Sequence, residues 1–109
     1  MYNFIKYMFS KNDLFINYDE IINRLFIDEN DKNKLNRVKL NHIFTNVCMI
    51  LENYLYIGDN NLDLSSFSIN KIIFVINCCY DNLLNLNYNV NMKLWLDSLF
   101  SKIIGGLYD

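Results

Sequence analysis

Residues that could carry out catalysis or bind a metal are few and widely scattered in this sequence. His42 is the only histidine, and no cysteine pair lies at a spacing typical of a zinc site. Of the three cysteines, Cys78 and Cys79 lie in the most apolar segment, where thiols are usually buried and unreactive, and Cys48 stands apart from them. We therefore expect no metal and no cofactor, and we interpret His42 as a hydrogen-bonded or exposed helical residue.

The other familiar catalytic patterns are also missing. None of the three glycines belongs to a phosphate-binding loop. Ser65, Ser66 and Ser68 lack the strand and turn that surround a serine nucleophile. Asp59 and Asp63 flank a loop, where most acidic residues are solvated turn residues. The sequence predicts a protein that is not an enzyme.

Length and charge narrow the class of protein further. A chain of 109 residues predicts a single domain, residues 1–109, and its 52% hydrophobic and 20% charged residues exclude a disordered chain. The net charge of −2 argues against nucleic-acid binding. A basic cluster at residues 32–39 could contact phosphates, but we interpret it as a solvated helix face that balances the acidic residues 28–31.

The sequence also indicates in which compartment of the cell the protein is found. An odd number of cysteines without a disulfide framework favours a reducing compartment. Uninterrupted apolar runs such as Ile72–Ile76 fall far short of the roughly 20 residues that a membrane span needs. Asn3 and Lys6 interrupt the apolar start, which has no small-residue cleavage site and so does not resemble a signal peptide. We expect a soluble intracellular protein without a membrane span.

The hydrophobic pattern predicts helices along the whole chain. Apolar residues recur at helical spacing in segments 2–10, 18–27, 32–57, 69–86 and 91–104, and we expect 32–57 to be a short helix followed by a longer one. Gly58 is expected to end that helix in the left-handed conformation. One of the serines at 65–68 should cap the next helix, Asn91 should open the last one, and Gly105-Gly106 should stop it.

The segment Ile69–Leu86 is the most apolar part of the chain. Only a thin polar stripe around Asn70, Asn77 and Asp81 interrupts it, and a helix that is apolar nearly all round belongs inside a protein. The β-branched run at 72–76 would also suit a buried strand, but the length of the segment and the lack of partner strands favour a helix. We predict an all-α bundle of five to seven helices with this segment at its centre.

Aromatic residues make up 16% of the chain and are candidates for a partner surface. Tyr2, Phe4, Tyr7 and Phe9 encircle the first helix, and Trp95 is expected on the side of the last helix that faces away from the core. A small domain cannot bury every aromatic ring. Either these rings are an ordinary core with scattered exposed members, or they form a dimer surface or a groove for an amphipathic helix.

Several stretches resemble one family when they are taken in order. These are Ile5-Lys6-Tyr7-Met8-Phe9, Lys11-Asn12-Asp13, Asn17-Tyr18, Leu25-Phe26, Asp28-Glu29, the start Ile69-Asn70-Lys71 of the apolar segment, and the end Leu107-Tyr108. Together they cover about half of the chain and are similar to small, dimeric, intracellular poxviral Bcl-2-like virulence proteins. The order of the elements and the length of the chain carry this resemblance.

The resemblance implies a fold and a function. It implies a Bcl-2-like bundle of six to seven amphipathic helices around a central hydrophobic helix, with no enzymatic activity, in the host cytoplasm. Such proteins hold the Bcl-2-homology-3 (death-motif) helix of host pro-apoptotic proteins in a groove. Others bind innate-signalling adaptors and inhibit NF-κB and interferon induction, and several form homodimers through the first and sixth helices. A homodimeric scaffold subunit is a further alternative.

The resemblance also implies which residues bind. The predicted groove-lining residues are Ile22, Leu25, Phe26, Phe44, Val47, Leu51, Ile72, Phe74 and Ile76. Lys71 stands near the position of the arginine that, in cellular relatives, pairs with an aspartate of the bound helix; a solvated lysine is the alternative. Tyr2, Phe9 and Trp95 are the predicted outer face for an adaptor or a second copy of the chain.

Overall fold

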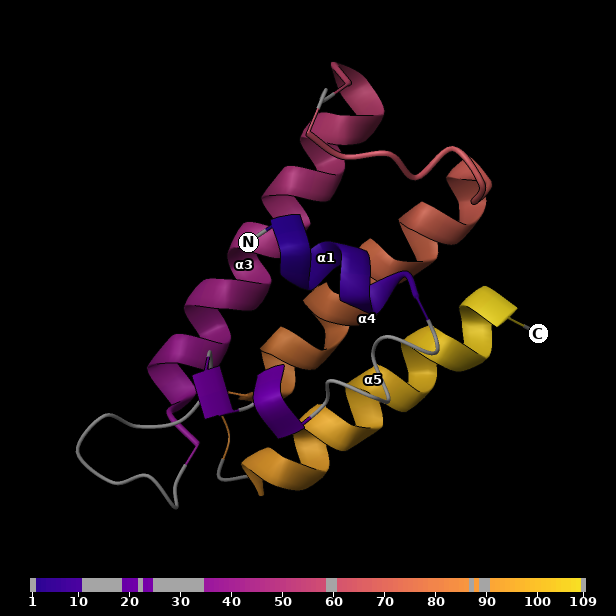
Figure 1. Ribbon diagram of the computed structural model, residues 1–109. Helices are drawn as coiled ribbons and strands as arrows, with labels where there is room; N and C mark the ends of the chain where they lie inside the picture. Colours follow the sequence, from indigo (N-terminus) through magenta and orange to yellow (C-terminus); the bar gives the residue numbers. More distant parts are fainter. Residues whose placement is uncertain are drawn as a thin grey trace.

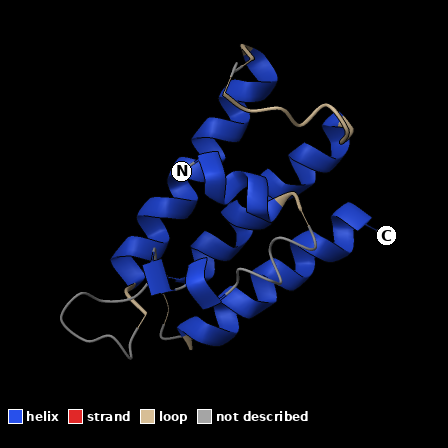
Figure 2. Cartoon of the chain, viewed as in Figure 1, coloured by secondary structure: helices blue, strands red, loops and turns tan. Residues whose placement is uncertain are grey.

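In the computed structural model the described part of the chain is all-α (Figures 1 and 2). The structure describes residues 2–10, 19–21, 23–24, 35–58, 61–86, 88 and 91–108. The helices are α1 (Tyr2–Met8), α3 (Arg37–Tyr56), α4 (Ile69–Leu86) and α5 (Met92–Tyr108), and residues 19–21 and 23–24 are also helical. No strand occurs within these ranges, so the predicted all-α class is confirmed, and so is a helix rather than a strand at 69–86.

Three long helices determine the arrangement. α3 and α4 form an antiparallel hairpin, α5 packs along the other side of α4, and α1 lies across the bundle and contacts α5 (Figure 1). α4 therefore has a long helix on each of two sides. No helix of the described ranges is both long enough and apolar enough to cross a membrane.

The ends of α3 follow from local chemistry. Asn36 caps its start, because the Asn36 side-chain oxygen accepts a hydrogen bond from the Lys39 amide at 3.1 Å. Gly58 ends it with φ at 86°, and its amide donates to the carbonyls of Asn53 and Tyr54. The predicted left-handed Gly58 is confirmed. The predicted short helix before α3 begins at residues outside the described ranges, and Leu35 and Asn36 themselves are not helical.

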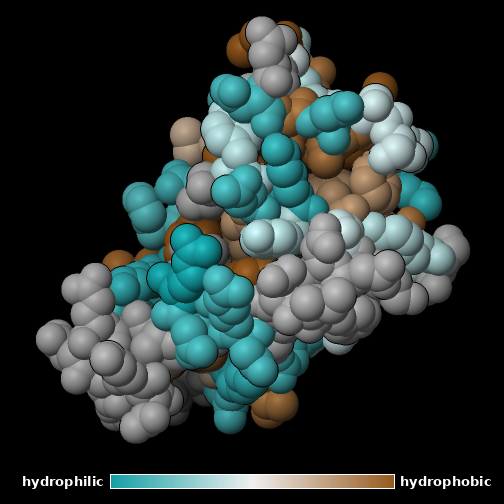
Figure 3. All heavy atoms as spheres, viewed as in Figure 1, coloured by the Kyte–Doolittle hydropathy of each residue, from teal (hydrophilic) through white to brown (hydrophobic). Residues whose placement is uncertain are grey.

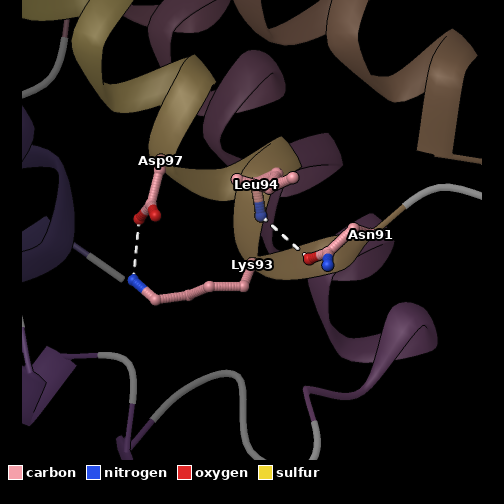
Figure 4. Close-up of polar contacts among 4 residues, drawn as sticks. All are labelled: Asn91, Lys93, Leu94 and Asp97. Carbon is pink, nitrogen blue, oxygen red and sulfur yellow. Dashed lines mark hydrogen bonds and ion pairs between the residues drawn. The ribbon is translucent and has the colours of Figure 1, made fainter.

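The predicted caps of the next two helices are also confirmed. The Ser68 hydroxyl accepts a hydrogen bond from the Lys71 amide at 3.2 Å at the start of α4. The Asn91 side chain accepts one from the Leu94 amide at 3.1 Å at the start of α5 (Figure 4). Each cap satisfies an amide that the first helical turn leaves without a partner, which is typically worth about 1 kcal/mol.

The prediction that Gly105-Gly106 stops the last helix is wrong, because α5 continues to Tyr108. Glycine inside a helix costs only about 1 kcal/mol relative to alanine. A Cβ atom at Gly106 would overlap the ring of Phe74 from α4, so the missing side chain makes room for a packing contact. The last turn is also held by buried Leu107 and by the Tyr108 hydroxyl, which donates to the Phe9 carbonyl at 2.7 Å.

Phe44 lies at the centre of the core. Its ring meets those of Phe4 from α1 at 5.7 Å and Trp95 from α5 at 5.5 Å, both edge to face, and Phe100 lies 6.2 Å away. The Trp95 indole N–H donates to the Asn82 carbonyl of α4 at 2.6 Å. Rings from α1, α3 and α5 therefore meet at one point, and one of them is hydrogen-bonded to α4.

The segment Ile69–Leu86, which was predicted to lie at the centre of the bundle, packs between α3 and α5 but keeps one side open. One stripe of α4 is buried, while Ile69 and Leu84 are 65% and 69% exposed and Ile73, Phe74 and Tyr80 are also exposed in part. The reason is that α3 and α5 pack on two sides of α4 and leave the third side open. Of the three long helices, α5 turns the most side chains, seven, into the core.

Replacing Trp95 with phenylalanine tests the polar contact in this core. Trp95→Phe removes the indole N–H and some buried volume, so we expect a loss of about 1–3 kcal/mol in the free energy of unfolding. Urea denaturation followed by far-UV circular dichroism measures it. Tyr56→Phe is the control, because Tyr56 is 86% exposed and should change stability by less than about 0.5 kcal/mol. Equal stability of both variants would contradict the assignment.

Candidate functional site

Five of the ten residues predicted to line the groove lie inside the packed α3–α4 hairpin. Phe44, Val47 and Leu51 of α3 and Ile72 and Ile76 of α4 are all buried members of the core. The structure thus brings these five together, as predicted, but they form a closed floor with no surface open to a partner. Ile22, Leu25 and Phe26 lie outside the described residues.

Lys71 and Phe74, two further predicted groove residues, face α5 instead of α3. The Lys71 ammonium group donates a hydrogen bond to the Leu107 carbonyl at 2.7 Å, where a positive charge also offsets the negative end of the α5 dipole. Phe74 packs over Gly106. Both expectations are therefore corrected: positions 71 and 74 lie on a different face of α4 from 72 and 76, and Lys71 is engaged within the chain.

An exposed apolar surface runs along the outer side of the same hairpin. Met49 and Tyr56 lie on one face of α3, and Ile73 and Tyr80, seven residues apart, lie on one face of α4. The helices are joined here, since the Tyr80 hydroxyl donates to a Glu52 carboxylate oxygen at 2.7 Å. Ile69 and Leu84 extend the α4 stripe by one turn in each direction. We call these six apolar and aromatic residues the hairpin face: Met49, Tyr56, Ile69, Ile73, Tyr80 and Leu84.

A shallow hollow lies at the closed end of the hairpin, beside Ile69. Its walls are mainly apolar and come from the end of α3, the loop at 61–68 and the start of α4: Tyr54, Leu55, Gly58, Leu64, Ser65, Phe67, Ile69 and Ile72. Figure 3 shows hydrophobic atoms exposed at this upper end of the molecule. The loop is fixed because Leu64 is buried and its amide donates to the Tyr54 hydroxyl at 3.1 Å. A hollow with such a lining suits an apolar group.

A second hollow lies at the start of α3. It is lined by Arg37, Val38, Asn41, His42 and Thr45. The His42 ring lies 3.3 Å from the Asn46 amide nitrogen and is exposed, which confirms the interpretation of His42 as a surface residue. Within the described ranges no three His, Cys, Asp or Glu side chains gather as a metal site would require.

The predicted outer face is largely internal. Trp95, 6% exposed, packs against Phe44, and Phe9 packs edge to face on Phe67 at 5.1 Å. The prediction that Trp95 faces away from the core is wrong, because the indole N–H reaches the Asn82 carbonyl and draws the ring inward. Tyr2 is half-buried. Neither Phe9 nor Trp95 offers surface to a second molecule, and the homodimer stays a prediction.

Sequence reasoning missed the hairpin face, although one signal for it was available. The segment Ile69–Leu86 carries more apolar residues than two neighbouring helices can cover. Comparisons of the chain with models of protein families, with curated proteins and with solved structures find no match. The face itself consists of exposed apolar and aromatic side chains, with Glu52 hydrogen-bonded to Tyr80 at its middle.

A spectroscopic titration tests the contact across the hairpin. The hydrogen bond to Glu52 raises the pKa of Tyr80 to about 12, because the bond requires the protonated phenol. We expect Glu52→Gln to return the Tyr80 pKa toward its ordinary value of about 10. The absorbance of phenolate, with Tyr80→Phe as the subtraction reference, measures it. Because the folded-state pKa is raised, this contact contributes to stability below about pH 10 and is lost as the pH rises through 12. An identical titration in Glu52→Gln would refute the contact.

Proposed function

We propose that the chain is a non-enzymatic, Bcl-2-like binding protein that takes an amphipathic helix of a host pro-apoptotic protein along its α3–α4 hairpin. The observation that carries the proposal is the hairpin face, which leaves large apolar side chains in water above a floor of buried aliphatic residues. Each Å² of such surface that a partner covers is worth roughly 25 cal/mol before ordering costs. Exposed apolar surface of this kind is typical of binding sites.

The spacing of the exposed apolar side chains on the hairpin suits a helical ligand. A helix that binds a groove presents apolar side chains at positions i, i+3 or i+4, and i+7. The hollow beside Ile69 would hold one of these, the stripe from Ile73 to Leu84 would take others, and the rest would reach the buried floor once α3 and α4 separate. A buried anchor of leucine size contributes roughly 1.5–3 kcal/mol before ordering costs, so about four or more such anchors are needed for the roughly −12 kcal/mol of a nanomolar complex.

The resemblance to poxviral Bcl-2-like proteins supplies the class of partner. The described residues share with that family an all-α architecture. On this proposal the protein is a viral inhibitor of apoptosis in the host cytoplasm, and it sequesters death-motif helices. Val47, Leu51, Ile72 and Ile76 would contact the ligand only after α3 and α4 move apart, because they are buried in the closed hairpin.

The closed floor favours a second candidate function. With the predicted groove residues buried, the hairpin face alone is available to a rigid protein. An innate-signalling adaptor of the NF-κB or interferon pathway, or a second copy of the chain acting as a homodimeric scaffold, could bind there without any opening. Light scattering tests the second copy, and co-precipitation with individually expressed adaptors tests the first.

Calorimetric titration with a panel of death-motif peptides distinguishes these functions. We expect binding of at least one peptide, and a loss of tenfold or more in affinity on Ile73→Asp, because a charge on the hairpin face would be buried by the ligand. Leu94→Asp is the matched control, since Leu94 is 66% exposed on α5, away from the face. Circular dichroism should show both variants folded. No heat with any peptide at tens of micromolar would reject sequestration.

A further inference from the structure

Two of the three cysteines meet inside the α3–α4 hairpin. Cys48 of α3 and Cys79 of α4 are fully buried, and both are free thiols. The Cys48 thiol donates to the Ile76 carbonyl at 3.9 Å, which places its sulfur against the turn of α4 that contains Cys79. Ile76 and Cys79 are three residues apart and lie on the same face of α4. The two thiols therefore face each other across the middle of the hairpin.

We propose that Cys48 and Cys79 are an oxidation site, and that a disulfide between them locks the hairpin shut against the helical ligand. The inference rests on the proposed function, because it assigns regulation to the same site. The groove floor residues Val47 and Leu51 flank Cys48 within one turn, and Ile76 lies one turn from Cys79. A covalent bond at this point would prevent the separation of α3 and α4 that exposes the floor.

The electrostatics of the pair favour the reaction. The neighbouring Cys79 thiol lowers the pKa of Cys48, because hydrogen bonding between the two groups stabilises the Cys48 thiolate. The same interaction, together with burial, raises the pKa of Cys79 well above its ordinary value. Cys48 is thus the nucleophile of the pair, since the thiolate is the reactive form. Cys78 is half-buried, and burial raises its pKa, so the neighbouring thiol is not activated.

The chemistry balances with a peroxide as the oxidant. The Cys48 thiolate attacks one oxygen of hydrogen peroxide, the O–O bond breaks, and Cys48 becomes a sulfenic acid as hydroxide leaves and takes up a proton. The Cys79 sulfur then attacks the Cys48 sulfur, the S–O bond breaks, and water leaves with the Cys79 proton. In sum two thiols are oxidised to one disulfide and one peroxide is reduced to two waters. Because both sulfurs are buried, the reaction proceeds through transient opening of the hairpin.

The first experiment measures the crosslink in the full chain without any ligand. Purified protein is treated with hydrogen peroxide and analysed by intact mass and by peptide mapping with and without reductant. We expect the loss of two hydrogen atoms within one chain and a rise in melting temperature of roughly 10 °C or more, since the bond closes a long loop in the unfolded chain. Oxidation without this crosslink, or a disulfide between chains, would overturn the proposal.

Cysteine variants identify the pair. Cys48→Ser and Cys79→Ser should each abolish the crosslink, whereas Cys78→Ser, the matched control one residue away, should retain it. A crosslink that requires Cys78 would overturn the assignment. Should a serine at a buried position prevent folding, the Cys78→Ser protein alone decides the question, because only Cys48 and Cys79 then remain to pair.

The last step tests the link to ligand binding. The oxidised protein should bind the best peptide of the panel at least tenfold more weakly than the reduced protein, and dithiothreitol should restore the affinity. A crosslink that leaves the affinity unchanged would overturn control of the site while the proposed function stands. If no peptide binds, the proposed function fails, and regulation of the site fails with it. The mass and melting data would still decide whether the pair is oxidised.

Discussion

The ring of Phe44 fixes the relation of three helices, and most of the core depends on it. It touches Phe4 from α1 and Trp95 from α5, and Trp95 is in turn hydrogen-bonded to the α4 backbone at Asn82. Edge-to-face aromatic pairs add to the free energy of burial and restrict the angles at which the helices can pack. Once α1, α3 and α5 meet at this ring, α4 is held between α3 and α5.

That arrangement explains why one side of α4 is open. A helix with long neighbours on two sides can bury about half of its circumference, and α4 carries apolar residues on more than half. The surplus is the hairpin face. The hydrogen bond between Tyr80 and Glu52 crosses this face, and the remaining apolar area is exposed to solvent.

The features that sequence alone could predict are those decided within a few residues. Ser68 and Asn91 cap helices because their side chains reach an amide three residues away, and Gly58 ends α3 because its own backbone tolerates a positive φ. Helix periodicity likewise identified α3, α4 and α5. These statements need no knowledge of what lies across the core.

The features that sequence could not predict are decided by distant residues. α5 continues through Gly106 because the Phe74 ring fills the space beside this glycine. Trp95 turns inward because the Asn82 carbonyl of α4 accepts a hydrogen bond from its indole N–H. Lys71 was expected to face a ligand, but it meets the Leu107 carbonyl 36 positions away. The open side of α4 could not be predicted from the sequence either, because the number of helices that pack around α4 is determined by the whole bundle.

The final turn of α5 ties together parts of the chain that are remote in sequence. The Tyr108 hydroxyl donates a hydrogen bond to the carbonyl of Phe9, 99 positions earlier. The Leu107 carbonyl accepts a hydrogen bond from the Lys71 ammonium group at the start of α4. Fraying of this one turn therefore releases the end of α1 and the first turn of α4 together. The two extremities of the described chain should consequently exchange their amide protons as a single cooperative unit.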